Sequence, residues 1–194
     1  MNIPNVYALL IYLIEHNGGS FHGKTNIHKN IYLLQQMMPR IDLPLKFSPY
    51  FYGPFSQDVS EALDLLESSG LLKVSAIDYG VRDSFEVRKY IYKLTSSGRS
   101  AAESVKKNYN EFASVIDSNF AKLISTGYHE NTKVISTASK VKHILSAEKK
   151  SLTRKSIQAK AKELGWEINT RDLSASVKVL VDIGLARTGD PSQK

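Results

Sequence analysis

The hydrophobic pattern of the first hundred residues changes period in a fixed order, and this order restricts the possible folds more than any other feature. Three segments, at residues 6–14, 25–38 and 57–69, place an apolar side chain every three or four positions. That spacing is typical of helices that bury one face. Two β-prone runs follow, at residues 71–77 and 85–94. The sequence therefore predicts three helices and then a hairpin.

Residues that start and stop helices agree with this order. Pro4 lies near the start of the first segment, and Asn17-Gly18-Gly19 ends it. Ser56 can cap the third helix. The preceding stretch, Leu45 to Phe55, is aromatic and is closed by Gly53-Pro54, so we expect a short strand or an ordered loop and then a turn. The order favours a winged helix-turn-helix, with a mixed α+β domain of another kind as the alternative.

A long helical pattern follows, from Thr95 to about Ser125. Its apolar residues recur every three or four positions, which resembles a heptad stripe. The stripe consists of Val105, Tyr109, Phe112, Ile116, Phe120 and Leu123. One interpretation makes this segment a dimerisation helix, and the other packs the stripe within the chain. Gly127 to Asn131 is the best candidate for a boundary between two units.

The last third repeats the pattern in shorter form. Helices are expected at residues 132–147, 154–164 and 171–183, with Thr153 and Thr170 at N-cap positions. Five identities at an offset of 114 residues link the helix that begins at Gln57 to the one that begins at Arg171. They are Asp58/Asp172, Ser60/Ser174, Leu66/Leu180, Gly70/Gly184 and Leu71/Leu185. Helix-end chemistry can produce so short a match, so it indicates similar architecture and not duplication.

The expected fold is therefore mainly α with small β wings, an α+β fold of tandem winged helix-turn-helix units joined by a long helix. The first unit covers residues 1–95. Residues 96–128 form the connecting or dimerisation helix, and residues 129–194 form a basic winged-helix unit.

Part of the first unit resembles a known family. The segment Lys29-Asn30-Ile31-Tyr32-Leu33-Leu34, followed by Tyr50-Phe51-Tyr52-Gly53-Pro54-Phe55-Ser56 and Leu66 to Leu72, resembles the small bacterial YwgA-like winged-helix proteins. It is also similar to the Panacea-type antitoxin domain, which has a similar lysine-and-tyrosine helix and an aromatic-Gly-Pro turn. The resemblance covers roughly residues 1–100. The tryptophan of the Panacea turn is replaced here by Phe51 or Tyr52. The resemblance implies a winged-helix fold and suggests an antitoxin role.

Charge is distributed unevenly along the chain. The formal net charge is +7, of which residues 1–128 contribute +1 and residues 129–194 contribute +6. A basic C-terminal unit attracts an acidic partner such as DNA, although a lysine-rich face can also serve only to keep a helical unit soluble.

The helix expected to enter the DNA groove differs between the two units. In the first unit it carries Asp58, Glu61, Asp64 and Glu67 and no base, which makes it a poor reader of a polyanion. The C-terminal unit offers residue types that hydrogen-bond bases or phosphates. These candidate DNA contacts are Lys149, Lys150, Arg154, Lys155, Lys160, Lys162, Asn169, Thr170, Arg171, Ser174 and Lys178. The alternative is a solvated basic helix pair. Trp166 is expected to anchor the core between the two helices.

The aromatic turn has two interpretations. Gly53 and Pro54 set the backbone angles that launch the third helix. The surrounding Tyr50, Phe51, Tyr52 and Phe55 can pack alternately into the core and onto the surface. The cluster is then mainly structural, or its exposed members bind a partner protein, because three consecutive aromatic residues of an extended segment cannot all face one core.

The sequence gives no sign of catalysis. The absence of cysteine excludes disulfides and thiolate metal sites, and the five histidines lack zinc-site spacing. Gly23-Lys24-Thr25 imitates the end of a phosphate loop but follows a helix rather than a strand. We expect no enzymatic activity, no metal and no cofactor.

The longest apolar run, Val6 to Ile14, is too short to span a bilayer, and no signal-peptide pattern opens the chain, which predicts a cytoplasmic protein.

These features lead to a DNA-binding protein that acts as a transcription regulator or an antitoxin-like factor. Its C-terminal unit contacts double-stranded DNA, its N-terminal unit receives a partner such as a toxin or a defence-system protein, and residues 95–125 make it a homodimer. The alternative is a protein-interaction scaffold, an accessory subunit of a phage-defence or chromosome-organising complex. Salt-dependent binding to random duplex DNA separates the two.

Overall fold

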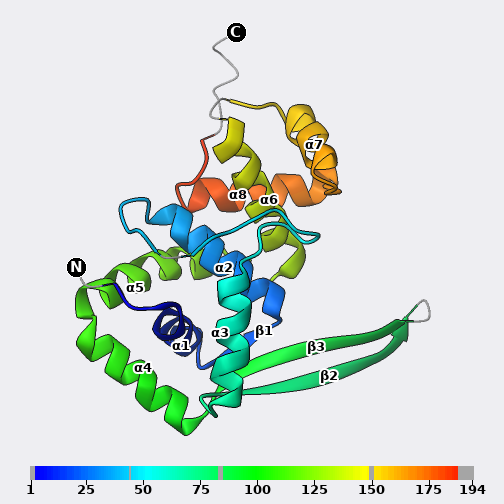
Figure 1. The fold of residues 1–194 in the computed structure, drawn as a ribbon. Helices are drawn as coiled ribbons and strands as arrows, with labels where there is room; N and C mark the ends of the chain where they lie inside the picture. Colours follow the sequence, from blue (N-terminus) through cyan, green and yellow to red (C-terminus); the bar gives the residue numbers. More distant parts are fainter. Residues whose placement is uncertain (1–2, 44, 83–84, 149–150, 188–194) are drawn as a thin grey trace.

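The computed structural model describes residues 3–43, 45–82, 85–148 and 151–187. These residues form eight helices and three strands, so the fold is mainly α with a small antiparallel sheet, as predicted. The elements are α1 (Val6–His16), β1 (Ser20–His22), α2 (Lys24–Met37), α3 (Gln57–Ser68), β2 (Leu72–Arg82), β3 (Phe85–Leu94), α4 (Ser96–Asn108), α5 (Asn110–Ser125), α6 (Thr132–Glu148), α7 (Arg154–Glu163) and α8 (Thr170–Asp182). Figure 1 shows α6, α7 and α8 at one end of the molecule and α1, α4 and α5 at the other.

The strands form one sheet in the order β1-β3-β2. The hairpin of β2 and β3 is the predicted one, and it projects away from the helices (Figure 1). Strand β1 was not predicted, because three residues are too few to show an alternating pattern and their partners lie far along the chain in β3. The aromatic stretch before α3 is an ordered loop, with a single bridge between Ser48 and Phe55.

The expected long helix is two helices. Tyr109 leaves the helical conformation (φ −128°, ψ 44°) and separates α4 from α5. Hydrophobic spacing could not reveal this break, because the apolar stripe continues across it: Val105 lies on one side and Phe112 on the other. The prediction of a continuous connecting helix is therefore wrong.

The buried side chains of both halves form one continuous hydrophobic core. The stripe of α5 belongs to it, since Phe112, Ile116 and Phe120 have no exposed surface. This is the intramolecular packing that the sequence left as one of two alternatives. The stripe is not available as a dimer interface, and a homodimer through it has no basis in the structure.

The C-terminal helices begin and end as local chemistry requires. Thr153 caps α7, as predicted, but the N-cap of α8 is Asn169 and not Thr170. Ser56 occupies the N-cap position of α3 without a capping side-chain hydrogen bond. Residues 151–187 contain no strand, so the wing expected in this half is not present in the part that the structure describes.

Three of the five identities in the internal repeat are explained by helix-end chemistry: Leu66/Leu180, Gly70/Gly184 and Leu71/Leu185. Gly70 and Gly184 have positive φ angles of 72° and 78°. After each, the next residue donates its N–H to the carbonyl of the leucine four residues before the glycine. Gly165 closes α7 in the same way, although it has no counterpart in the repeat. The shared leucine and glycine positions thus belong to a common C-cap.

The segment between the halves is fixed to α2 by side-chain hydrogen bonds. Asn26 Nδ2 donates to the carbonyl of Glu130 at 3.0 Å, and Asn30 Nδ2 donates to that of His129 at 2.7 Å. The carboxylate of Glu130 also pairs with His22 Nδ1 of β1 at 2.8 Å. The predicted boundary at Gly127 to Asn131 is therefore a packed junction.

None of the helices in the described ranges is long and apolar enough to cross a membrane.

Candidate nucleic-acid interface and aromatic loop

The outward face of α8 carries three of the predicted DNA contacts. Leu173, Val179 and Leu180 are buried in the core, which turns the opposite side of the helix to solvent. Arg171 and Lys178 are exposed there, seven residues apart and therefore on one face. Ser174, half-buried, lies between them.

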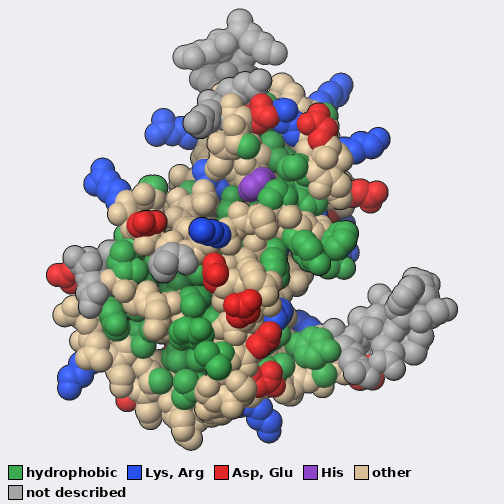
Figure 2. Space-filling view, in the orientation of Figure 1, with side chains coloured by type: hydrophobic (Ala, Val, Ile, Leu, Met, Phe, Trp, Pro, Cys, Tyr) green, Lys and Arg blue, Asp and Glu red, His purple; other side chains and the backbone are tan. Residues whose placement is uncertain are grey.

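The start of α7 meets this face. The guanidinium of Arg154 donates from Nη1 to Ser174 Oγ at 3.2 Å, so a basic side chain of α7 lies against the first turns of α8. Lys155 and Lys162 are exposed on α7 and, seven residues apart, share one of its faces. Figure 2 shows Lys and Arg side chains standing out from this end of the molecule. We define Arg154, Arg171, Ser174 and Lys178 as the α8 face.

Other predicted contacts have different roles. Lys160 pairs with Glu148 of α6 at 2.6 Å. The hydrogen bond raises the pKa of the lysine, and the pair ties α7 to α6. Lys178 pairs with Asp182 at 2.6 Å, which raises its pKa, but its side chain is 70% exposed and the pair can open toward a phosphate. Lys149 and Lys150 lie outside the described residues.

Asn169 and Thr170 mark the beginning of α8. Asn169 Oδ1 accepts from the N–H of Asp172 at 2.8 Å, and its Nδ2 donates to the Asp172 carboxylate at 2.6 Å. Asn169 was predicted to contact DNA, but its side chain is used in this reciprocal cap. Thr170 is exposed in the first turn, next to Arg171.

The acidic character expected for α3 is visible on the surface. Asp58, Glu61, Asp64 and Glu67 are all exposed, and Figure 2 shows carboxylates gathered over this helix. Only Asp64 has a basic partner among the described residues, Lys24 at 3.1 Å. The surface of α3 therefore repels a polyanion.

The loop at residues 48–56 is held by its backbone. Lys29 of α2 is 2% exposed, and its Nζ donates to the carbonyl of Pro54 at 2.7 Å. Trp166, buried between α7 and α8 as predicted, donates from Nε1 to the carbonyl of Tyr50 at 2.7 Å. Gly53 has φ 99°, and an added Cβ would lie 3.0 Å from Lys140 Cγ of α6. Both halves of the molecule thus fix this loop.

Two titratable groups under the loop are strongly perturbed. Burial lowers the pKa of Lys29 to about 7, and the charge of Lys140 adds to the shift. Burial also lowers the pKa of His28 to about 4, although its ring nitrogens face the carbonyls of Lys24 and Ser56 at 2.8 and 3.1 Å. A neutral imidazole can donate to only one of these two oxygens.

The aromatic side chains of the loop point outward. Tyr50, Phe51 and Tyr52 are 53%, 75% and 68% exposed, and Phe55 is half-buried and stacks on His28 with ring centroids 4.8 Å apart. The expected alternation between core and surface is therefore wrong, because hydrogen bonds from α2 and Trp166 hold the backbone and leave the rings on the surface. There Tyr50 packs against Phe51 and Phe55, with ring centroids 4.8 and 5.2 Å apart. Three adjacent exposed aromatic residues on a fixed loop form an apolar patch of the kind that binds partners.

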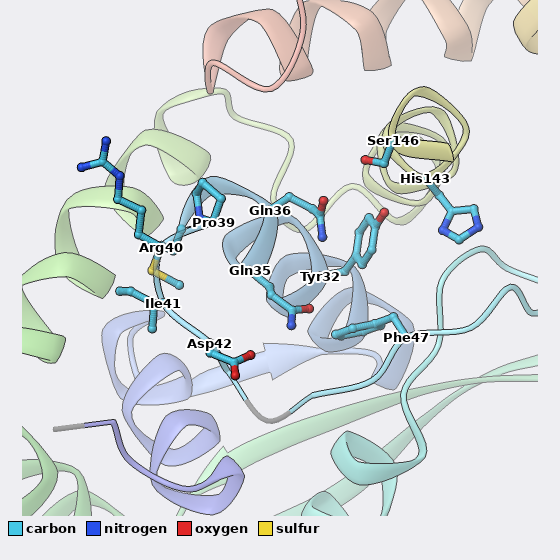
Figure 3. Close-up of a pocket in the computed structure, with 11 residues that line it drawn as sticks. Tyr32, Gln35, Gln36, Pro39, Arg40, Ile41, Asp42, Phe47, His143 and Ser146 are labelled. Carbon is cyan, nitrogen blue, oxygen red and sulfur yellow. The ribbon is translucent and has the colours of Figure 1, made fainter. Parts of the chain in front are cut away.

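A separate cavity of about 610 Å³ lies between α2, the loop after it and α6. Figure 3 shows the hydroxyls of Tyr32 and Ser146 and the amide of Gln36 directed into the same space. The cavity is wide open and away from the α8 face. Within the described residues no group of three or more His, Asp or Glu side chains could hold a metal ion.

No protein-family model matches the chain, and a search of curated proteins found no relative. The α8 face is thus a candidate DNA-contact surface on geometry and charge alone. Sequence reasoning missed Lys29 and His28, because an amphipathic pattern does not distinguish a buried lysine or histidine from an exposed one.

Proposed function

We propose that the protein is a DNA-binding regulatory protein, a transcription regulator or an antitoxin-like factor, and that the α8 face contacts double-stranded DNA. The observation that carries the proposal is the contact of Arg154 with Ser174 beside exposed Arg171, which brings two guanidinium groups to the solvent-facing side of α8 near its start. Arginine and serine at the start of such a helix are suited to base edges and phosphates.

The fold supports this proposal. The first half runs α1-β1-α2-α3-β2-β3 with sheet order β1-β3-β2, an order compatible with a winged helix and with the YwgA-like and Panacea-type resemblance. The C-terminal half places α7 and α8 in succession, joined by a short turn at Gly165, as in a helix-turn-helix. Tandem units of this kind remain our interpretation of the two halves.

The test compares Arg171→Ala with Lys106→Ala in the full chain. Lys106 is exposed on α4, so its loss removes the same charge elsewhere. If Arg171 reads a base edge, Arg171→Ala weakens binding to the preferred duplex by about 1–3 kcal/mol and binding to random duplex by less. Lys106→Ala leaves both nearly unchanged. Fluorescence anisotropy on labelled duplexes measures the affinities. A parent protein that ignores duplex DNA at low salt contradicts the proposal.

The exposed aromatic loop favours a second candidate function, a protein-interaction scaffold. Tyr50, Phe51 and Tyr52 offer a rigid apolar patch close to the acidic face of α3. In a regulator this patch receives the partner, such as a toxin, and in a scaffold it is the main binding site. Absence of DNA binding in the test above, together with capture of a defined partner that Phe51→Ser abolishes, selects the scaffold.

A further inference from the structure

The register of the sheet places three lysines on one face of the β2–β3 hairpin. Lys73 of β2 lies directly opposite Lys93 of β3, and Lys89 lies opposite Ile77. Cross-strand partners share a face, as do residues an even number of positions apart along a strand, so all three lysines point to one side. Lys73 and Lys93 are exposed and Lys89 is half-buried. Apart from the backbone hydrogen bonds of the sheet, none of the three ammonium groups forms an ion pair or hydrogen bond with another described residue.

This arrangement costs stability in the free protein, because like charges directly opposite each other on neighbouring strands repel. Lysine on an edge strand can be explained as protection against edge-to-edge aggregation. That explanation covers Lys73 on the edge strand β2, and Lys89, which lies beyond the part of β3 that pairs with β1, but not Lys93, which has a strand on both sides. A binding role for an anionic partner accounts for all three.

The acidic helix lies on the other face of the sheet. Tyr92, between the lysines in sequence, is turned inward and is 6% exposed. Leu63 and Leu66 of α3 lie in the same hydrophobic core as Tyr92, so α3 covers this inner face. Burial, and then the charges of Asp64 and Glu67 on α3, raise the pKa of Tyr92 to about 12. On the lysine side, Glu130 is paired with His22 of β1 at 2.8 Å. The lysines are therefore separated from the carboxylates that would repel a polyanion.

We infer that Lys73, Lys89 and Lys93, the hairpin lysine face, bind the sugar–phosphate backbone of DNA as a second contact. This rests on the proposed function and adds to it a contact from the N-terminal half. Lys89 and Lys93 are four residues apart in β3 and span about 13 Å. That length covers about four phosphate steps of one DNA strand along the helix axis. Ser20 and Ser75, on the same face, can donate hydroxyl hydrogen bonds to phosphates.

The three lysines follow the hairpin outward from its base. Lys73 and Lys93 lie at the base, beside β1, and Lys89 lies farther along the ribbon that projects from the helices (Figure 1). Phosphate contacts position a protein without reading sequence, so the hairpin lysine face should strengthen binding to all duplexes equally. Base selectivity stays with the α8 face.

The test replaces all three lysines by glutamine in the full chain. The matched control is the triple change Lys106→Gln, Lys107→Gln and Lys122→Gln, which removes three exposed charges from α4 and α5. Both variants carry the same net charge. Binding to random duplex is measured by anisotropy at several salt concentrations. We expect the hairpin variant to lower the slope of log K against log salt by roughly two to three units, at about 0.9 per phosphate contact, and the control by less than one.

Two further measurements separate the possible failures. The triple change of Lys73, Lys89 and Lys93 to Arg should retain the parent slope, because the charge is kept. The glutamine variant should melt no lower than the parent, because the repulsion between Lys73 and Lys93 is removed. If the parent binds DNA, Arg171→Ala weakens it and the hairpin variant keeps the parent slope, the inference is overturned while the proposed function stands. If the parent does not bind duplex DNA, both the proposed function and this inference are contradicted.

Discussion

Lys29 shows how one buried side chain can couple the fold to pH. Its ammonium group is almost completely removed from water, and the carbonyl of Pro54 is its one hydrogen-bond partner in the described residues. Burial lowers its pKa from 10.5 to about 7, so the unfolded chain binds more protons than the folded chain between these values. Stability should therefore rise as the pH is raised from about 7 toward 10.5, and fall as it is lowered again.

Lys29→Met tests this coupling, because methionine fills similar space without a charge. Urea unfolding at pH 7 and pH 9 should show the parent gaining stability, with a limiting slope of about 1.4 kcal/mol per pH unit from this group. Lys29→Met should lack this contribution to the rise in the free energy of unfolding between pH 7 and pH 9. Lys107→Met, on the exposed surface of α4, should keep the parent's pH dependence. Identical pH dependence in the parent and in Lys29→Met would contradict the assignment.

At the scale of the element, α5 is a core helix rather than an interface. Phe112 and Ile116 have no exposed surface and pack within the same chain. Truncating either to alanine should lower the free energy of unfolding by about 2–5 kcal/mol through the lost contacts and the cavity that remains. Changing both to glutamate should prevent folding, because two unpaired carboxylates would be buried.

Circular dichroism and sedimentation on the same variants measure this outcome. Ser118→Glu, at an exposed position of α5, should leave both the fold and the mass unchanged. A dimeric parent that the double glutamate variant converts into folded monomers would show that the stripe is an interface after all.

At the scale of the whole molecule, the two halves should unfold together. They share one hydrophobic core, and Trp166 of the C-terminal half is hydrogen-bonded to Tyr50 of the N-terminal half. Trp166 is the only tryptophan, so its fluorescence reports on the junction. Leu13→Ala, in the core of α1, should lower the urea midpoint seen by Trp166 as much as the midpoint seen by circular dichroism.

Leu65→Ala, at a leucine of α3 that is 49% exposed, serves as the control and should shift both midpoints little. If Leu13→Ala moves only the circular dichroism transition, the halves are independent units and the continuous core does not couple them.

The sequence by itself determined the local structure of this protein. Apolar spacing, helix caps and C-terminal glycines act between residues a few positions apart, so α1, α2, α3, the hairpin and the three C-terminal helices could be predicted from neighbours alone. Net charge likewise showed that the last third is basic, and helical spacing placed Arg171, Ser174 and Lys178 on one face.

Only the tertiary structure decided the features that depend on distant partners. The burial of Lys29, the pairing of Lys160 with Glu148 and the short strand β1 each need a partner from another element. The sequence also left undecided whether the apolar stripe on α5 packs within the chain or against a second chain. An apolar face has the same sequence pattern in both cases. The opposed Lys73 and Lys93 emerged only from the strand register, which alternation within single strands does not fix.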